Sequence, residues 1–424
     1  MKEMLIKRPE YLEKLKKWSR DPGLVKIVTG VRRCGKSKLF TLFGQYLMSD
    51  GVDESQIHTI QLDMLENRAF LDPVKLYEHV LGRLVPVKMN YVFLDEIQMV
   101  PDWQMVANSL KEKDNVDLYL TGSNAYMFSS KLGTIVGGRY VEIKMQPLSF
   151  KEYVEGVHEV QKVSDVPKIQ MFGSPDLMAD YHRYVVQGGF PQTLKYDGDA
   201  ELINTYLMDT VYNNTISKDI IERYNLRSPE KLNEVVKFLF DNISNETSIL
   251  NIERQLGGSV SNDSINKYVQ GLLDSYLIYR CDRMDLKGKK ILTSSPKYYI
   301  CDMGLRHAVL GSRIGDDGKI LENIVYLELI RRGYTVYIGK IGRKTQGGEF
   351  KELEVDFIAT KEGGVVEYYQ VAWSVDEESV LKRELGSLEQ INDSYPKYLI
   401  TMGAGSGIHN GIKHVNALQW LMEK

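Results

Sequence analysis

A glycine-rich segment near the N-terminus carries the residue types needed to hold phosphate. Gly30 and Gly35 enclose four residues, and Lys36 and Ser37 follow directly, so the segment fits G-x-x-x-x-G-K-[ST]. Backbone N–H groups in such a loop cradle phosphate oxygens together with the N-terminus of the next helix. Lys36 is expected to reach the β- and γ-phosphates and the Ser37 hydroxyl to ligate Mg²⁺. The expected nucleotide-binding residues are Gly30, Val31, Arg32, Arg33, Cys34, Gly35, Lys36, Ser37 and Lys38.

Two adjacent acids follow an apolar run and predict the hydrolytic part of the site. Asp95 and Glu96 come directly after Tyr91-Val92-Phe93-Leu94, which fits a buried parallel strand whose carboxyl end faces the nucleotide. Asp95 is expected to hold the metal ion and Glu96 to polarise the attacking water. A glutamate in this position favours hydrolysis over phosphate transfer to a second substrate. A solvated acid pair is the alternative, and the phosphate loop upstream argues against it.

Two further segments could sense or stabilise the phosphates. Ser123 and Asn124 follow the apolar run Val116–Leu120, and one of them is expected to sense the γ-phosphate, with a polar turn as the alternative. Arg139 precedes the next strand, where an arginine can reach a neighbouring subunit's nucleotide and stabilise transition-state charge. This role requires a homo-oligomer, and the alternative is a structural arginine.

The elements that must position these residues alternate along the chain. Strands are expected at 24–28, 57–62, 91–94 and 116–120, and helices at 9–19 and 38–48. Strands separated by helices predict a parallel α/β sheet, so residues 1–150 are expected to form one nucleotide-binding α/β domain.

The rest of the chain is expected to form three further units. Residues 151–225 are expected to form a helical region. Residues 226–312 predict a winged-helix-like domain, because helices at 231–242, 249–256 and 261–274 precede a hairpin. Residues 313–424 predict a second α/β unit with a helix at 321–332, strands at 335–339, 355–359, 366–371 and 397–401, and a helix at 377–392.

Composition sets the broad class of the protein. The chain has 424 residues, of which 43% are hydrophobic and 26% charged, and its net charge of −3 gives no global positive field for nucleic acid. Its three cysteines lie far apart, which argues against a disulfide scaffold. No signal peptide and no apolar run of about 20 residues is evident, so a cytoplasmic setting without membrane partners is expected.

Local positive charge nevertheless gathers in the expected hairpin. It carries Arg280, Arg283, Lys287, Lys289, Lys290 and Lys297 against Asp282 and Asp285. The hairpin could contact DNA through Lys287, Lys289 and Lys290, or it could contact a protein partner, because winged helices do both. From residue 315 onward acidic residues outnumber basic ones, which argues against an extensive DNA groove there.

The motifs in this order resemble those of AAA-type ATPases. GVRRCGKS, FLDEIQ, LTGSNA and GGRYVEIKMQPLSFKEY look more narrowly like a prokaryotic family of predicted ATPases with an N-terminal AAA domain and a C-terminal domain of unknown function. YVVQGGFP (184–191) and KYYICDMGL (297–305) resemble two further segments of that family. The resemblance implies ATP and Mg²⁺ as ligands, with Arg8 and Tyr11 bordering the adenine.

The last unit resembles the restriction-endonuclease-like PD-(D/E)XK fold. The matching positions are Glu322, Asp356 and Gln370, but the expected (D/E)xK tripeptide reads Gln-Val-Ala at 370–372. A second carboxylate and the lysine are therefore missing, which predicts a scaffold without nuclease activity. The leading hypothesis is ATP hydrolysis that moves the C-terminal domains. The alternatives are an ATP-gated DNA- or protein-binding module with little turnover, and an ATP-coupled nuclease.

Overall fold

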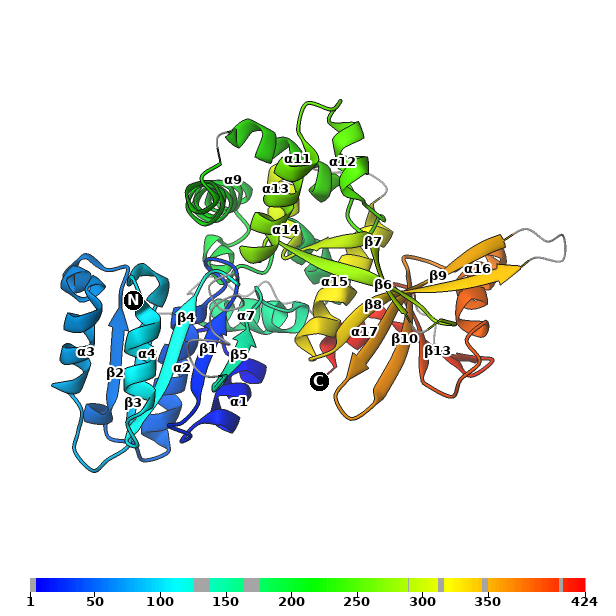
Figure 1. Cartoon of the computed structure of the whole chain (residues 1–424). Coiled ribbons are helices and arrows are strands. Elements are labelled where there is room, and N and C mark those ends of the chain that lie inside the picture. The colour runs from blue at the N-terminus through cyan, green and yellow to red at the C-terminus, as the bar shows by residue number, and fades with distance from the viewer. Residues whose placement is uncertain are drawn as a thin grey trace.

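The computed structural model describes residues 5–125, 138–163, 176–226, 228–288, 290–311, 316–344, 350–403 and 407–423. Figure 1 shows an N-terminal α/β region in blue and cyan, a helical region in green, and a C-terminal region built on a second sheet in yellow to red. The predicted fold class, α/β with a parallel sheet, is confirmed. None of the helices among these residues is both long enough and apolar enough to pass through a membrane.

The N-terminal region is one parallel sheet with helices on both faces. Its strand order is β2-β3-β4-β1-β5, and every neighbouring pair is parallel. The elements are α1 (Pro9–Trp18), β1 (Val25–Thr29), α2 (Lys36–Ser49), η1 (Glu54–Gln56), β2 (Ile57–Gln61), η2 (Leu65–Leu71), α3 (Pro73–Leu81), β3 (Asn90–Asp95), η3 (Ile97–Met99), α4 (Trp103–Lys111), β4 (Val116–Gly122) and β5 (Tyr140–Lys144).

Successive residues of the central strands point to opposite faces of this sheet, so apolar side chains cover both faces. Val25 and Ile27 of β1 belong to the core beneath α3 and α4, whereas Val28 belongs to the core that includes α2. Because all five strands are parallel, the residues after β1, β3 and β4 meet at one edge. The phosphate loop, the acid pair and the Ser-Asn segment therefore lie together, as the sequence predicts.

The middle of the chain is helical and ends in a hairpin. Its elements are α7 (Phe150–Val163), α8 (Leu177–Gln187), the 3-10 helix η4 (Pro191–Tyr196), α9 (Ala200–Thr205), the π-helical turns η5 (Tyr206–Tyr212) and η6 (Thr215–Ile221), α10 (Glu222–Tyr224), α11 (Pro229–Asp241), α12 (Ile249–Gln255), α13 (Asn262–Asp274), β6 (Ile278–Asp285), β7 (Lys290–Ile300) and α14 (Met303–Leu310). The three helices and the hairpin predicted for residues 226–312 are present, in the predicted order.

The C-terminal region contains the second sheet. Its own elements are α15 (Asp317–Arg331), β8 (Thr335–Lys344), β9 (Phe350–Lys361), β10 (Val365–Ala372), α16 (Glu378–Glu389), β11 (Lys397–Thr401), β12 (Gly407–His409), β13 (Ile412–Asn416) and α17 (Ala417–Met422). The sheet order is β12-β13-β11-β10-β9-β8-β6-β7.

This sheet crosses the boundary expected between residues 312 and 313. β6 of the hairpin pairs in parallel with β8, placing Arg283 beside Ile338 and Asp285 beside Lys340. At the turn of the hairpin, the Leu286 N–H donates to the Lys340 carbonyl at 3.0 Å. The hairpin is therefore not a freely projecting wing. It forms the edge of the C-terminal sheet, so the two expected domains share one sheet.

Candidate functional site

The phosphate loop connects β1 to α2 and depends on its two fixed glycines. Gly30 has φ = 146° and Gly35 has φ = 107°, a region that residues with side chains rarely adopt. A Cβ on Gly30 would also lie 2.0 Å from the Met145 carbonyl oxygen. The two glycines of the sequence pattern are therefore required by the backbone that places N–H groups around a phosphate.

Lys36 occupies the centre of this loop. It is the first residue of α2, two residues earlier than the sequence suggested, and its side chain is buried. Its ammonium donates to the Gly30 carbonyl at 2.9 Å and to the Val31 carbonyl at 3.2 Å. A buried cation held by neutral carbonyls is well placed to bind an anion in the loop. Arg33 and Lys38 are exposed.

A hydroxyl network joins the loop to the end of β3. The Ser37 side chain hydrogen-bonds the Asp95 carboxylate, and the Thr121 hydroxyl donates to Asp95 Oδ1. Burial raises the pKa of Asp95, an effect that the two hydroxyls partly offset. Thr121 also accepts from the Glu96 N–H at 2.8 Å. Ser37 and Asp95, the two predicted metal ligands, are therefore in direct contact.

Glu96 has an unusual backbone and an unpredicted neighbour. It adopts the left-handed conformation with φ = 55° and ψ = 47°, which is uncommon for a residue with a side chain and is often found at functional sites. The Gln98 amide donates to the Glu96 carboxylate and, at 3.3 Å, to the Ser123 hydroxyl. The acid and the Ser-Asn segment thus meet through Gln98. Asn124 is completely buried.

Arg139 lies at the opposite end of the sheet from the phosphate loop. It is exposed and precedes β5, and its carbonyl accepts from the Val25 N–H at 3.1 Å. Because β5 runs parallel to β1, the five residues of β5 separate Arg139 from the loop edge. At about 3.3 Å per residue this is roughly 16 Å, so Arg139 cannot serve the phosphate loop of its own chain.

A second arginine, Arg32, connects the phosphate loop to the helical region. Its guanidinium forms two bonds with the buried Asp219 carboxylate of η6, at 2.5 and 2.8 Å. Arg32 was expected only as a loop residue, and nothing in the sequence singled out Asp219. Two-point pairing of this kind fixes the geometry as well as the charge.

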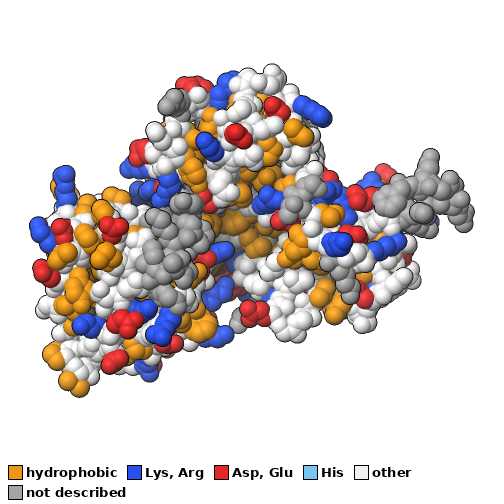
Figure 2. Space-filling model, viewed as in Figure 1, with side chains coloured by type: hydrophobic (Ala, Val, Ile, Leu, Met, Phe, Trp, Pro, Cys, Tyr) orange, Lys and Arg blue, Asp and Glu red, His pale blue; other side chains and the backbone are white. Residues whose placement is uncertain are grey.

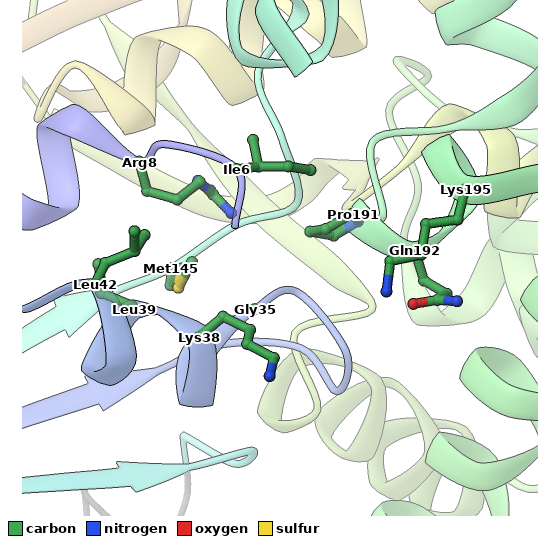
Figure 3. Close-up of a pocket in the computed structure, with 10 residues that line it drawn as sticks. All are labelled: Ile6, Arg8, Gly35, Lys38, Leu39, Leu42, Met145, Pro191, Gln192 and Lys195. Atoms are coloured by element: carbon green, nitrogen blue, oxygen red, sulfur yellow. The ribbon is translucent and has the colours of Figure 1, made fainter. Parts of the chain in front are cut away.

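A cavity of about 80 Å³, open to solvent on one side, lies beside the loop. Figure 3 shows Leu39 and Leu42 of α2 facing Pro191 and Gln192 across it. The other lining residues are Ile6, Arg8, Gly35, Lys38, Met145 and Lys195.

Arg8 and Tyr11, which the family resemblance implies border adenine, lie in different surroundings. Arg8 lines the cavity, where its guanidinium bonds Glu152 Oε1 at 2.9 Å and the Cys34 carbonyl at 3.0 Å. Tyr11 is buried against Gln146, from whose N–H it accepts a bond at 3.1 Å, and it does not line the cavity.

The nuclease-like positions also come together, around a lysine. Asp356 Oδ2 accepts from the Val371 N–H at 2.8 Å, and the Asp356 N–H donates to the Gln370 side chain at 3.4 Å. The buried Lys297 pairs with Glu322 at 3.0 Å and with Glu354 at 2.7 Å. Although burial opposes its charge, these carboxylates raise the pKa of Lys297.

A divalent metal ion does not fit this cluster. The Lys297 ammonium already neutralises the carboxylates that would have to bind the ion, and Gln370 supplies an amide in place of a charged ligand. Within the described residues, no three His, Cys, Asp or Glu side chains are grouped to hold a metal.

Part of the positive charge counted in the hairpin is neutralised by acidic residues outside it. Lys297 is buried in the cluster, Arg283 pairs with Glu246 at 3.0 Å, and Arg280 pairs with Asp282 at 2.8 Å. Lys287 and Lys290 are exposed, whereas Lys289 lies outside the described residues. On the face in Figure 2, acidic and basic side chains are interspersed. The sequence count overestimated the available charge because it could not see these ion pairs.

Comparison with known proteins places two domains on the chain. A family model described as an AAA domain matches residues 23–154, and one described as a domain of unknown function (DUF8612) matches residues 178–314. An uncharacterized protein of Haemophilus influenzae is 32% identical over 429 residues and covers 100% of both chains. The uncharacterized protein MJ1544 of Methanocaldococcus jannaschii is 26% identical over 92% of this chain and 84% of its own.

Solved structures resemble the chain more distantly. The Aeropyrum pernix Orc1 protein in complex with DNA has a TM-score of 0.32 at 12% identity, covering 72% of this chain and 92% of its own. AMPPCP-bound DnaA from Aquifex aeolicus has a TM-score of 0.31 at 11% identity, covering 62% and 86%.

Proposed function

We propose that this chain, which belongs to the family of the full-length Haemophilus influenzae relative and carries an AAA domain, is a Mg²⁺-dependent ATPase. The observation that carries the proposal is the phosphate loop, in which the buried Lys36 faces inward while Ser37 contacts Asp95. The phosphates of a nucleotide in the loop would accept hydrogen bonds from backbone N–H groups and from the Lys36 ammonium.

The residues present fit both ATP and Mg²⁺. Gly30 and Gly35 give the loop the backbone conformation that a phosphate cradle requires, and Ser37 and Asp95 offer the oxygen ligands that Mg²⁺ prefers. When bound, Mg²⁺ supplies neutralisation of the phosphate charge. The adjacent cavity, bordered by Ile6, Met145 and Pro191, suits a flat apolar base, and we assign it to adenine. No NKxD segment for guanine occurs in the sequence.

Glu96 is the proposed base and Ser123 the proposed phosphate sensor. Glu96 orients and polarises the attacking water, and its link through Gln98 to Ser123 makes its position responsive to the γ-phosphate. The Gln98 amide donates to the Ser123 hydroxyl, which favours Ser123 for this role.

The same bond favours a second function, ATP-gated binding with little turnover. The Gln98 amide occupies the Glu96 carboxylate, which would slow hydrolysis until a partner releases it. Phosphate release, measured with and without single-stranded and duplex nucleic acids and alongside the native mass, distinguishes the two functions. An ATPase releases phosphate steadily, whereas a gated module binds ATP and releases phosphate only with its partner.

Three contacts would couple the nucleotide bound in the loop to the helical region and to the hairpin. Arg32 of the loop holds Asp219 of η6. After β4, the Ala125 N–H donates to the Asp274 carbonyl at the end of α13 at 2.9 Å. The Tyr276 hydroxyl donates at 3.1 Å to Glu142, which also accepts from Thr29 next to the loop. These contacts support a conformational coupling between ATP and the C-terminal regions.

The C-terminal regions would then carry out binding, not cleavage. We propose that residues 226–312 form a winged-helix-like unit and that residues 313–424 form a restriction-endonuclease-like scaffold, joined through β6 and β8. Residues 1–150 and 151–225 form the ATPase domain and its helical extension. The Lys297-centred cluster supports a scaffold role, because it leaves no site for the metal that such nucleases require.

Contacts to DNA, where they occur, are expected at the exposed turn of the hairpin. Changing Lys287, Lys289 and Lys290 together to alanine should weaken duplex binding and reduce its salt slope by up to about three units, because roughly 0.9 counterions are released per phosphate contact. Titration of labelled duplex at several salt concentrations measures both quantities. Lys382→Ala, which removes an exposed lysine from α16, is the control. An unchanged salt slope in the triple variant would mean that the hairpin contacts something other than DNA.

Arg139 is expected to act on the nucleotide of a neighbouring subunit. Arg139→Ala should leave ATP affinity nearly unchanged and lower turnover about 10³-fold or more, because the arginine meets charge that develops in the transition state. Specific activity of the unmodified protein should rise with concentration through the range in which it assembles.

Mixed assemblies test whether this site is shared. Arg139→Ala and Glu96→Gln subunits each lack a different half of the composite site, so mixtures should regain part of the activity. Mixtures that co-assemble by native mass but stay inactive would show that Arg139 is structural.

A further inference from the structure

Two glycine-containing motifs, far apart in sequence, pack against each other beside the base cavity. The first is the turn Gly188-Gly189 that precedes Pro191, and the second is Asp302-Met303-Gly304 at the start of α14. The buried Asp302 accepts from the Gly189 N–H at 2.6 Å and from the Leu305 N–H at 2.8 Å. One carboxylate therefore caps α14 and holds the turn at the same time.

The packing is too close for any side chain. A Cβ on Gly304 would lie 2.3 Å from the Gly188 nitrogen and 2.5 Å from its Cα. A Cβ on Gly188, which has φ = 76°, would lie 2.3 Å from Asp302 Oδ1. On its other side the turn is held by the Leu148 N–H, which donates to the Gly189 carbonyl at 2.7 Å. Backbone atoms cannot move aside as a side chain can, so Gly304 is required. Gly188 is required by its positive φ and by its close approach to the Asp302 carboxylate.

This contact fixes one wall of the cavity. Pro191 follows the turn after a single residue, and both Pro191 and Gln192 line the cavity opposite α2 (Figure 3). A Cβ on Gly35 of the phosphate loop would lie 3.7 Å from Pro191 Cγ, so this wall also stands next to the loop.

We infer that Asp302 and Gly304 are positioning residues for nucleotide-base recognition, holding the Gly188-Gly189 turn so that Pro191 and Gln192 can contact the base. The inference rests on the proposed ATP binding. It also implies that base binding is linked to the position of α14, because the Asp302 carboxylate holds both the Gly188-Gly189 turn and the start of α14. Residues of the AAA domain are thus not sufficient for base affinity.

Two substitutions break the contact in different ways. Asp302→Asn keeps one acceptor oxygen, and asparagine remains a good cap for α14, so the bond to Gly189 is the one lost. Gly304→Ala adds a methyl group against the Gly188 backbone. Gly318→Ala in α15 is the matched control, because its Cβ meets nothing within 4 Å.

The readout compares ATP with inorganic tripolyphosphate, both with Mg²⁺, by calorimetry. Both variants should bind ATP about tenfold more weakly, whereas tripolyphosphate, which lacks the base, should change less than about twofold. Unchanged ATP affinity in folded variants would overturn the inference. Equal loss of both ligands would also overturn it, since that is a general structural effect. Failure of the unmodified protein to bind either ligand would instead refute the proposed function.

Hydrogen exchange in the unmodified protein decides the matter even if the variants do not fold. ATP should protect the amides of residues 188–190, Gln192 and 302–305 together, and tripolyphosphate should protect neither segment. Protection of 188–192 alone by ATP, or equal protection by the two ligands, would contradict the inference.

Discussion

Replacing Lys36 with alanine is expected to lower ATP affinity by roughly 10²-fold or more. The ammonium would bond both the β- and the γ-phosphate, and hydrogen bonds to charged groups contribute about 1.5–3 kcal/mol each. Its present partners are the neutral carbonyls of Gly30 and Val31, which can remain within the loop when the lysine is removed. Calorimetric titration with ATP and Mg²⁺ measures the loss.

The control for Lys36→Ala is Lys88→Ala. Lys88 is exposed and precedes β3, at the amino edge of the sheet, away from the loop. Both variants should keep the unfolding temperature of the unmodified protein without nucleotide, and only Lys36→Ala should lose the rise in that temperature when ATP is added. ATP binding by Lys36→Ala at the unmodified affinity would place the nucleotide elsewhere on the chain.

Glu96→Gln is expected to retain ATP binding and to lower turnover about 10²- to 10⁴-fold, the range for loss of a positioned base. The amide has the same shape and can keep the left-handed backbone, but it cannot accept the proton from water. A rate effect without a binding effect indicates an interaction made only during the reaction.

A matched substitution separates this effect from a simple loss of charge. Glu112→Gln neutralises an exposed carboxylate at the end of α4 and should leave both binding and turnover unchanged. Equal turnover by Glu96→Gln and the unmodified protein would remove Glu96 from the mechanism.

Local sequence patterns predicted the candidate site residues that lie at or just after the ends of strands. Gly35, Lys36 and Asp95 could be identified because a phosphate loop and a buried acid each require fixed residue types at fixed spacing. The parallel sheet then brings them together without further information. The residues that sequence reasoning missed, Gln98 and Asp219, act through side-chain contacts whose partners lie on other elements.

Contacts between distant segments explain the remaining differences. YVVQGGFP and KYYICDMGL could be recognised as motifs, but not as partners, because the Gly188–Gly304 contact joins segments more than a hundred residues apart. Likewise, the sequence predicts that the hairpin is a free wing. Its pairing with β8 could not be predicted, because it joins strands from two different regions of the chain. The buried Lys297 counted as surface charge for the same reason.

Steady-state phosphate release from ATP and Mg²⁺ tests the central claim most directly, with the unmodified protein and Glu96→Gln purified side by side. The account predicts saturable release by the unmodified protein that depends on Mg²⁺ and is lost in Glu96→Gln, while both proteins bind ATP. Release at the same rate from both proteins, or no binding of ATP by either, would contradict it.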